Sequence, residues 1–171
     1  MGTGKSVVGK LLAREISFRF ADTDKLIEEK VGKKIADIFA EEGEGWFRDL
    51  EAETVRNIMN EEGLVVSTGG GAVMNEESLN LFCQKGIVVW LTSRPEVILK
   101  RTQRRIGNRP LLQEGDPLQK IKKLMGEREV YYKRAEFFVD TSEMSIDRVI
   151  SQIKENIFGR YGASLSGETQ N

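Results

Sequence analysis

The residues best suited to chemistry stand at the start of the chain, in the run Met1-Gly2-Thr3-Gly4-Lys5-Ser6. This run matches the second half of the phosphate-binding pattern G-x-x-x-x-G-K-[ST]. Glycines let the backbone turn so that N–H groups face an anion, Lys5 brings a cation to the phosphates, and the Ser6 hydroxyl is a ligand for Mg²⁺. Apolar residues then recur at helical spacing, which places the motif at a helix N-terminus, where the dipole favours phosphate. The alternative is a flexible start with a chance Lys-Ser pair.

Two carboxylates follow the first apolar run, residues 17–21, in the sequence Asp22-Thr23-Asp24. Ligands of parallel sheets bind at the carboxyl ends of strands, so these side chains are candidates for a site. One carboxylate could hold Mg²⁺, through water, while the other receives a substrate hydroxyl. The alternative is ordinary capping of the helix that begins at Lys25, and the two interpretations are compatible.

Three consecutive glycines, Gly69-Gly70-Gly71, follow a second apolar run, residues 64–67. Because such a run is costly to order, it indicates a close approach to the backbone, although a bare turn is the alternative. Arg48 and Glu51 lie three residues apart on an amphipathic helix, so Glu51 could orient the guanidinium. Taken alone, the spacing of that pair favours a solvated surface ion pair.

A strongly basic segment, residues 100–112, passes from a helix into a loop that contains Gly107 and Pro110. In a phosphate-binding domain it predicts a lid, about residues 104–117, whose arginines stabilise charge on the transferred phosphoryl group. A solvated helix face and a small nucleic-acid patch are the alternatives. The absence of interleaved aromatic residues makes the second one weak.

Composition limits the functions that remain. The chain has 171 residues and a net charge of -1, which indicates one domain with no bulk attraction to nucleic acid. No apolar run approaches the length of a membrane span, and the single cysteine fits a reducing cytoplasm. The chain contains no histidine, so carboxylates, lysine or tyrosine must perform acid–base chemistry.

Short apolar runs alternate with helical periodicity along the chain. The runs cover residues 17–21, 64–67, 87–91 and 137–139, and the last helix carries isoleucines and a valine between Ile146 and Ile157. This alternation predicts an α/β fold in which helices cover both faces of a parallel sheet, a three-layer arrangement. Residues 160–171 are small and polar and predict a frayed tail.

Together these residues resemble shikimate kinases, a branch of the P-loop kinases related to nucleoside-monophosphate kinases. The resemblance runs from Met1 to about the last helix, and its order and spacing distinguish it from adenylate and gluconate kinases. It rests on Gly2-Thr3-Gly4-Lys5-Ser6, Asp22-Thr23-Asp24, Ile35-Ala36-Asp37-Ile38-Phe39, Phe47-Arg48 with Glu51, Gly69-Gly70-Gly71-Ala72-Val73, Asn108-Arg109-Pro110-Leu111-Leu112, and Arg128 with Tyr131-Tyr132.

The resemblance implies a single P-loop kinase domain with strand order 2-3-1-4-5 over residues 1–171. It implies transfer of the ATP γ-phosphate to the 3-hydroxyl of shikimate, which yields 3-phosphoshikimate and ADP in the route to chorismate and the aromatic amino acids. ATP and shikimate are then the partners of a cytoplasmic monomer, with Mg²⁺ as cofactor.

The same resemblance implies roles for individual residues. ATP would be held by residues 2–7, by Arg109, which reaches the transferred phosphate, and by Arg101, which stacks on adenine. Mg²⁺ would be held by Ser6 and Asp22. Shikimate would be bound by Asp24, Arg48, Gly70, Gly71 and Arg128, with the arginines on its carboxylate. Lys5, Asp24 and Arg109 would be the catalytic residues, and Asp24 takes the hydroxyl proton. The six ATP-binding residues of the loop are Gly2, Thr3, Gly4, Lys5, Ser6 and Val7.

Two departures from the family pattern stand out. The loop after the last strand reads Thr141-Ser142-Glu143-Met144-Ser145 and lacks the Arg and Pro that the family often carries there. The family's first strand, central in its sheet, and the first glycine of its phosphate loop are also missing. Met1 is then either an internal methionine of a longer kinase, the interpretation that the intact site favours, or the true start of an impaired one. In either case we expect the chain as written to be poorly stable and nearly inactive.

Two further functions remain open. The chain could be a non-catalytic binding module that keeps the fold and part of the site. It could also be a kinase for another small polyol acid such as gluconate.

Overall fold

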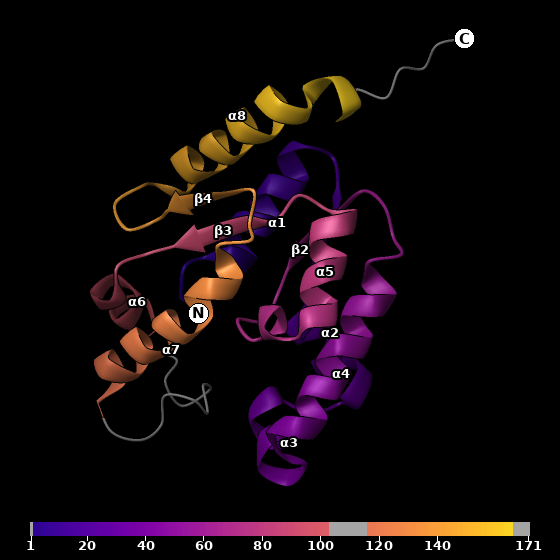
Figure 1. The fold of residues 1–171 in the computed structure, drawn as a ribbon, viewed down its shortest axis with the longest axis vertical. Helices are drawn as coiled ribbons and strands as arrows, with labels where there is room; N and C mark the ends of the chain where they lie inside the picture. The colour runs from indigo at the N-terminus through magenta and orange to yellow at the C-terminus, as the bar shows by residue number, and fades with distance from the viewer. Residues whose placement is uncertain (1, 103–115, 166–171) are drawn as a thin grey trace.

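The strands of this chain are short and parallel, and helices connect them. The computed structural model describes residues 2–102 and 116–165 (Figure 1). The elements are α1 (Lys5–Glu15), β1 (Arg19–Asp22), α2 (Thr23–Val31), α3 (Ile35–Glu41), α4 (Gly43–Ile58), β2 (Leu64–Ser67), the 3₁₀ helix η1 (Ala72–Met74), α5 (Glu76–Lys85), β3 (Val89–Thr92), α6 (Pro95–Thr102), α7 (Pro117–Tyr132), β4 (Phe137–Asp140) and α8 (Ile146–Leu165). The predicted α/β class is confirmed.

The strands form two parallel ladders. β1 pairs with β2, with Phe20 opposite Val65, and β3 pairs with β4, with Trp90 opposite Phe138. The order β1-β2 and β3-β4 agrees with the implied family order once the first strand of that order is left out. A cavity of about 1060 Å³ lies where β2 and β3 face each other across the gap.

Helices cover both faces of the strands. On one face, α1 and α8 enclose an apolar cluster with β3 and β4, made of Val8, Leu12, Leu91, Val139, Val149, Ile150 and Ile153. On the other face, a second cluster joins α4, η1 and α5 through Val55, Ala72 and Phe82, with Val88 packed against it. Figure 1 shows α8 lying along β3 and β4, while α4 and α5 stand on the side of β2.

Local sequence explains several helix ends. The Asn75 side chain accepts a hydrogen bond from the Ser78 N–H at 2.9 Å and so begins α5. Asp116 does the same for the Leu118 N–H, and Pro117 occupies the first helical position of α7. None of the helices within residues 2–102 and 116–165 has the length and hydropathy needed to cross a lipid bilayer.

The predicted tail is wrong for residues 160–165, because α8 continues past Gly159 to Leu165. The Arg160 guanidinium donates to the Glu136 carbonyl at 3.1 Å and lies 5.9 Å from the centre of the Phe137 ring. These contacts with the start of β4 stabilise the additional helical turn. Residues 166–171 lie outside the described part of the chain.

Candidate active site

The phosphate-loop residues adopt backbone conformations that require glycine. Gly2 and Gly4 have φ values of 68° and 96°, and Gly4 caps the N-terminus of α1. A Cβ at Gly2 would also lie 2.8 Å from the Thr102 side chain. Lys5 is the first residue of α1, so the helix N-terminus predicted for the motif is present.

Thr3 connects the phosphate loop to the ladder formed by β3 and β4. Its carbonyl oxygen lies 3.1 Å from the Thr141 hydroxyl, which is also 3.0 Å from the Thr92 carbonyl oxygen and can donate to either. Arg101 donates to the same hydroxyl at 2.9 Å and to the Thr141 carbonyl at 2.6 Å. The Arg101 guanidinium therefore lies at the loop after β4. Its contact with adenine stays a prediction.

Ser6 and Asp22 lie together, as a shared Mg²⁺ site requires. The Ser6 hydroxyl donates to Asp22 Oδ2 at 2.6 Å, and the Ser67 hydroxyl is 3.4 Å away. These are oxygen donors, which Mg²⁺ prefers, and Mg²⁺ typically takes few protein ligands together with waters and substrate phosphates. Within the described residues no group of three or more Asp, Glu, Cys or His could enclose a metal by itself. The donors present therefore suit a cation that a nucleotide brings with it.

The glycine run leaves room for three charged side chains. A Cβ at Gly69 would lie 2.5 Å from Glu51 Oε1 and 2.7 Å from Asp24 Oδ1, and one at Gly71 would overlap the Arg48 guanidinium. The Gly69 N–H also donates to the Thr23 hydroxyl at 3.0 Å. The prediction of a close approach is therefore confirmed. The approaching groups are carboxylates and a guanidinium.

Arg48 is held by two acids of its own helix. It donates to Glu51 Oε2 at 2.7 Å and to Glu44 Oε1 at 2.8 Å. The Glu51 side chain is only 3% exposed, so the surface ion pair that the spacing favoured is wrong. Burial raises the pKa of the Glu51 carboxyl and the charge of Asp24 adds to the rise, whereas Arg48 and Arg128 oppose it.

Arg128 of α7 belongs to the same charged cluster as Glu51. It is buried, and its charge acts on both Glu51 and Tyr132. Two buried polar atoms of this cluster have no hydrogen-bond partner within the described residues, the Arg128 Nε donor and the Glu51 Oε1 acceptor. Unpaired buried groups of opposite kind are costly to a protein without a ligand.

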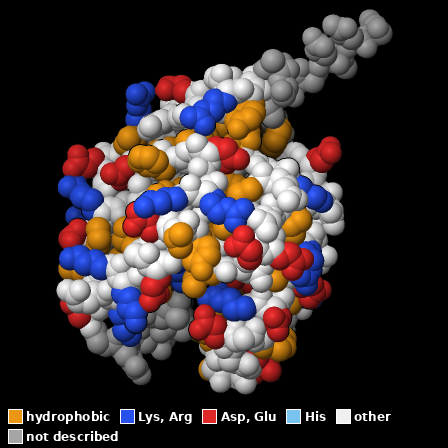
Figure 2. Space-filling model, viewed as in Figure 1, with side chains coloured by type: hydrophobic (Ala, Val, Ile, Leu, Met, Phe, Trp, Pro, Cys, Tyr) orange, Lys and Arg blue, Asp and Glu red, His pale blue; other side chains and the backbone are white. Residues whose placement is uncertain are grey.

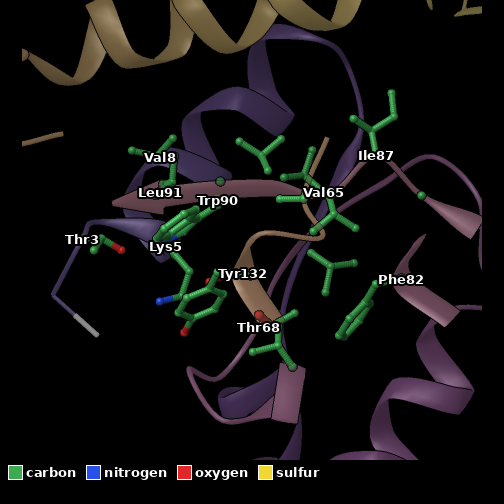
Figure 3. A pocket seen from close by; sticks show the side chains of 18 of the residues that line it. Thr3, Lys5, Val8, Val65, Thr68, Phe82, Ile87, Trp90, Leu91 and Tyr132 are labelled. Atoms are coloured by element: carbon green, nitrogen blue, oxygen red, sulfur yellow. The ribbon is translucent and has the colours of Figure 1, made fainter. Parts of the chain in front are cut away.

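Tyr132 is a site residue whose role the sequence did not reveal. Its hydroxyl donates to the Gly70 carbonyl at 3.0 Å, and its ring stacks on Trp90 at 5.5 Å. Burial raises the pKa of the Tyr132 hydroxyl. Its place four residues after Arg128, on one face of α7, is the signal that could have found it. Lys5, Trp90 and Tyr132 line one cavity (Figure 3).

The structure thus gathers the sequence-predicted residues into two neighbouring groups. Residues 2–7, with Asp22 and Arg101, surround the start of α1, while Asp24, Arg48, Gly70, Gly71 and Arg128 form the second group. Asp22 and Asp24, at the carboxyl end of β1 and the start of α2, connect the two groups. Arg109 and the predicted lid up to residue 115 lie outside the described residues.

Comparison with known proteins gives a consistent result. The family model described as "Shikimate kinase" matches residues 1–158. Shikimate kinase of Pelotomaculum thermopropionicum is 46% identical over 153 residues, which cover 90% of this chain and 88% of the relative. Shikimate kinase of Geobacter metallireducens is 45% identical over 160 residues, which cover 94% of this chain and 89% of the relative. The structure of shikimate kinase from Acinetobacter baumannii in complex with shikimate superposes with a TM-score of 0.90 at 36% identity, covering 94% of this chain and 89% of that one. The chain belongs to the shikimate kinase family.

Proposed function

We propose that this chain transfers the γ-phosphate of ATP to the 3-hydroxyl of shikimate. The observation that supports this most is a pair of buried atoms that have no hydrogen-bond partner among the described residues, the Arg128 Nε donor and the Glu51 Oε1 acceptor, of which Glu51 Oε1 lies beside Gly69. A ligand that satisfies both must carry an acceptor, such as a carboxylate, and a donor, such as a hydroxyl. Shikimate is a cyclic acid with three hydroxyl groups, and a related structure is described as a complex with shikimate.

The carboxylate end of the substrate would lie against Arg48 and Arg128. Guanidinium groups suit a carboxylate because they donate hydrogen bonds in a planar fork. Glu51 and Glu44 hold Arg48 in one orientation before substrate arrives. Such preorganisation lowers the entropy lost on binding.

The hydroxyl end would lie at Asp24, which is also against Gly69. There the carboxylate can accept a hydrogen bond from the attacking hydroxyl, orient it toward the phosphate and receive its proton. It need not be a strong base, because phosphoryl transfer depends mainly on positioning and electrostatics. With no histidine in the chain, Asp24 is the natural proton acceptor.

The phosphates would lie at the N-terminus of α1, where residues 2–7 offer backbone N–H groups and Lys5 offers a cation. Ser6 and Asp22 would hold Mg²⁺, which neutralises charge between the β- and γ-phosphates when bound. Arg109 would stabilise the transferred phosphoryl group and Arg101 would contact adenine. With Lys5 and Asp24, Arg109 completes the proposed catalytic set.

We further propose that the chain acts in the cytoplasm as a monomer, with ATP and shikimate as its ligands. Cationic and anionic side chains are interspersed on the face that Figure 2 shows, which gives no uniform field for a nucleic acid or an anionic membrane.

The first prediction tests the carboxylate site. Arg48→Ala should raise the KM for shikimate strongly and leave the KM for ATP nearly unchanged, because loss of one partner of a buried charged hydrogen bond costs on the order of 2–5 kcal/mol. Steady-state ADP production would be measured with shikimate and with gluconate as acceptors. The matched control is Arg56→Ala on the same helix, which removes an exposed ion pair to Glu77.

Equal increases in the KM for shikimate and the KM for ATP would show that Arg48 maintains the fold instead of binding the substrate carboxylate. Turnover with gluconate in preference to shikimate would overturn the proposed reaction.

A further inference from the structure

The proposed phosphoryl transfer assigns no task to Tyr132, which follows Arg128 by one turn of α7. The Tyr132 hydroxyl donates to the Gly70 carbonyl at 3.0 Å, across 62 positions of the sequence. Its ring stacks on Trp90 of β3, with ring centres 5.5 Å apart and ring planes inclined by 23° (Figure 3). The helix and the stacked ring therefore hold this hydroxyl in place against the glycine run.

The glycine run needs such a support, because glycine has more backbone freedom than any other residue. The carbonyl groups of Gly69 and Gly71 accept hydrogen bonds from backbone N–H groups of η1, at 3.3 and 2.9 Å. The Gly70 carbonyl between them is held by a side chain instead, through the hydroxyl of Tyr132. All three carbonyl groups of the run are thus occupied.

The N–H groups of the run are placed differently. The Gly69 N–H donates to the buried Thr23 hydroxyl at 3.0 Å. The N–H groups of Gly70 and Gly71 make no hydrogen bond to any group within residues 2–102 and 116–165. In a trans peptide the N–H points opposite to the C=O, so the bond from Tyr132 to the Gly70 carbonyl also sets the direction of the Gly71 N–H.

These two donors lie among the charged side chains of the site. A Cβ at Gly71 would overlap the Arg48 guanidinium, whereas a Cβ at Gly69 would meet the carboxyl groups of Glu51 and Asp24. The run therefore extends from the group proposed for the substrate carboxylate to the group proposed for the substrate hydroxyl. An oxygen atom of a ligand bound there can accept a hydrogen bond from the run.

The protonation state of Tyr132 suits a permanent donor. Burial raises the pKa of the Tyr132 hydroxyl above its ordinary value of 10.0, although the charge of Arg128 opposes the rise. A hydroxyl with such a pKa keeps its proton near neutral pH, so it continues to donate to the Gly70 carbonyl.

From these contacts we infer that Tyr132 is a positioning residue: its hydroxyl holds the Gly70 carbonyl and so fixes the glycine run with the N–H groups of Gly70 and Gly71 directed at the bound substrate. The inference takes the identity of that substrate, shikimate, from the proposed function. The alternative is that only the ring of Tyr132 matters, through its packing on Trp90. Removal of the hydroxyl alone distinguishes the two.

The first test needs no ligand and compares Tyr132→Phe with Tyr131→Phe in the full chain. Each substitution removes one hydroxyl from α7 and keeps the ring, and the Tyr131 hydroxyl makes no hydrogen bond within the part of the chain that the structure describes. In nuclear magnetic resonance spectra, Tyr132→Phe should split or broaden the amide resonances of Gly70 and Gly71, because their peptide planes gain alternative orientations. Tyr131→Phe should leave these resonances unchanged.

The second test measures binding by isothermal titration calorimetry, at a temperature where circular dichroism shows every variant folded. Tyr132→Phe should raise the dissociation constant for shikimate about five- to tenfold, the size of one lost hydrogen bond, and should change that for Mg²⁺·ADP by less than about twofold. A merely structural role would weaken both ligands alike or neither. Tyr131→Phe should change neither dissociation constant.

Unchanged amide resonances of Gly70 and Gly71 in Tyr132→Phe would overturn the inference, because the run would then keep its conformation without the hydroxyl. An unchanged dissociation constant for shikimate, or equal weakening of shikimate and Mg²⁺·ADP, would overturn it as well. If the unsubstituted chain does not bind shikimate, the proposed function fails by itself, since the comparison without ligand still decides whether Tyr132 positions the run.

Discussion

At the scale of single residues, the site depends on how four charges share a small buried space. Asp24, Glu51 and Arg48 converge on the glycine run and Arg128 acts on Glu51, so two carboxyl groups and two guanidinium groups offset each other without a ligand. Their hydrogen bonds are nevertheless incomplete, at Arg128 Nε and Glu51 Oε1. A substrate that bridges these atoms gains more than the same contacts would give in water.

The second prediction separates the roles of the two aspartates. Asp24→Asn should lower kcat far more than it weakens binding of Mg²⁺·ATP, because the amide cannot take a proton from the attacking hydroxyl. Asp22→Asn should instead raise the Mg²⁺ concentration needed for half-maximal rate, since Ser6 would lose its charged partner. Both are measured by Mg²⁺ titration at saturating shikimate. Interchanged effects would reverse the assignment.

The third prediction concerns pH and rests on the raised pKa of Glu51. In the window above the ordinary value of 4.5 and below the raised native value, the folded state holds a proton that the unfolded state has released. The free energy of unfolding therefore decreases as pH rises through that window. Glu51→Gln removes this titration, so its unfolding free energy should fall less steeply with pH. Urea unfolding across that window measures both slopes, and identical slopes would contradict the assignment.

At the scale of elements, β2 and α7 position the site from opposite directions. β2 ends at Ser67 and leads into the glycine run, while α7 brings Arg128 and Tyr132 onto it from the far side. α4 supplies Arg48 and Glu51 on one helical face. A change in any of these backbones should therefore appear as a change in substrate binding.

The fourth prediction compares two glycine substitutions. Gly71→Ala should raise the KM for shikimate, because the added Cβ would overlap the Arg48 guanidinium. The backbone at Gly71 has φ −96°, which alanine tolerates, so the effect would come from this overlap and not from backbone strain. Gly126→Ala, inside α7 with open space around it, should leave KM unchanged and stabilise the protein by about 0.5–1 kcal/mol. Steady-state kinetics and thermal unfolding test the pair. An unchanged KM in Gly71→Ala would mean that Arg48 moves aside freely.

Much of this arrangement was predictable because strand ends and motif spacing are local properties of a sequence. The runs that end at Asp22 and Ser67 predicted which residues meet at the carboxyl edge, and the helix after Lys5 followed from apolar periodicity. The burial of Glu51 was not predictable from its spacing to Arg48, because it depends on α7 and the glycine run packing over it. The length of α8 also escaped prediction, since the Arg160 contact to Glu136 is made across the fold.

At the scale of the whole molecule, helices connect the two ladders, and no strand pairing within residues 2–102 and 116–165 links them. α1 packs against α8 and also contacts β1 and β2, so it connects the halves across one face. In the part of the chain that the structure describes, no strand pairs with the edges of β2 and β3 that face the cavity, so main-chain hydrogen bonds do not link the two ladders there.

The fifth prediction follows from that gap. A fusion that places Ile-Val-Leu-Val-Gly ahead of residue 1 should raise the melting temperature and shikimate-dependent ADP production above those of the 171-residue chain, because the strand would support the phosphate loop directly. A matched fusion with proline in place of leucine should do neither. If the 171-residue chain already melts cooperatively and turns over as fast as the fusion, the gap between β2 and β3 reduces neither stability nor activity.

The pairing within each ladder also bears on the order in which the molecule folds. Residues 19–67 contain one complete ladder and residues 89–140 contain the other, and no strand pairing among the described residues links the two spans. Each span can therefore nucleate without waiting for the other. The docking of α1 against α8 closes a long loop, because Glu15 and Lys154, which meet at 2.8 Å, are 139 positions apart in the sequence. Contacts with such a separation in sequence form late and mainly retard unfolding, so the docking of these two helices sets the lifetime of the native state more than the rate at which it is reached.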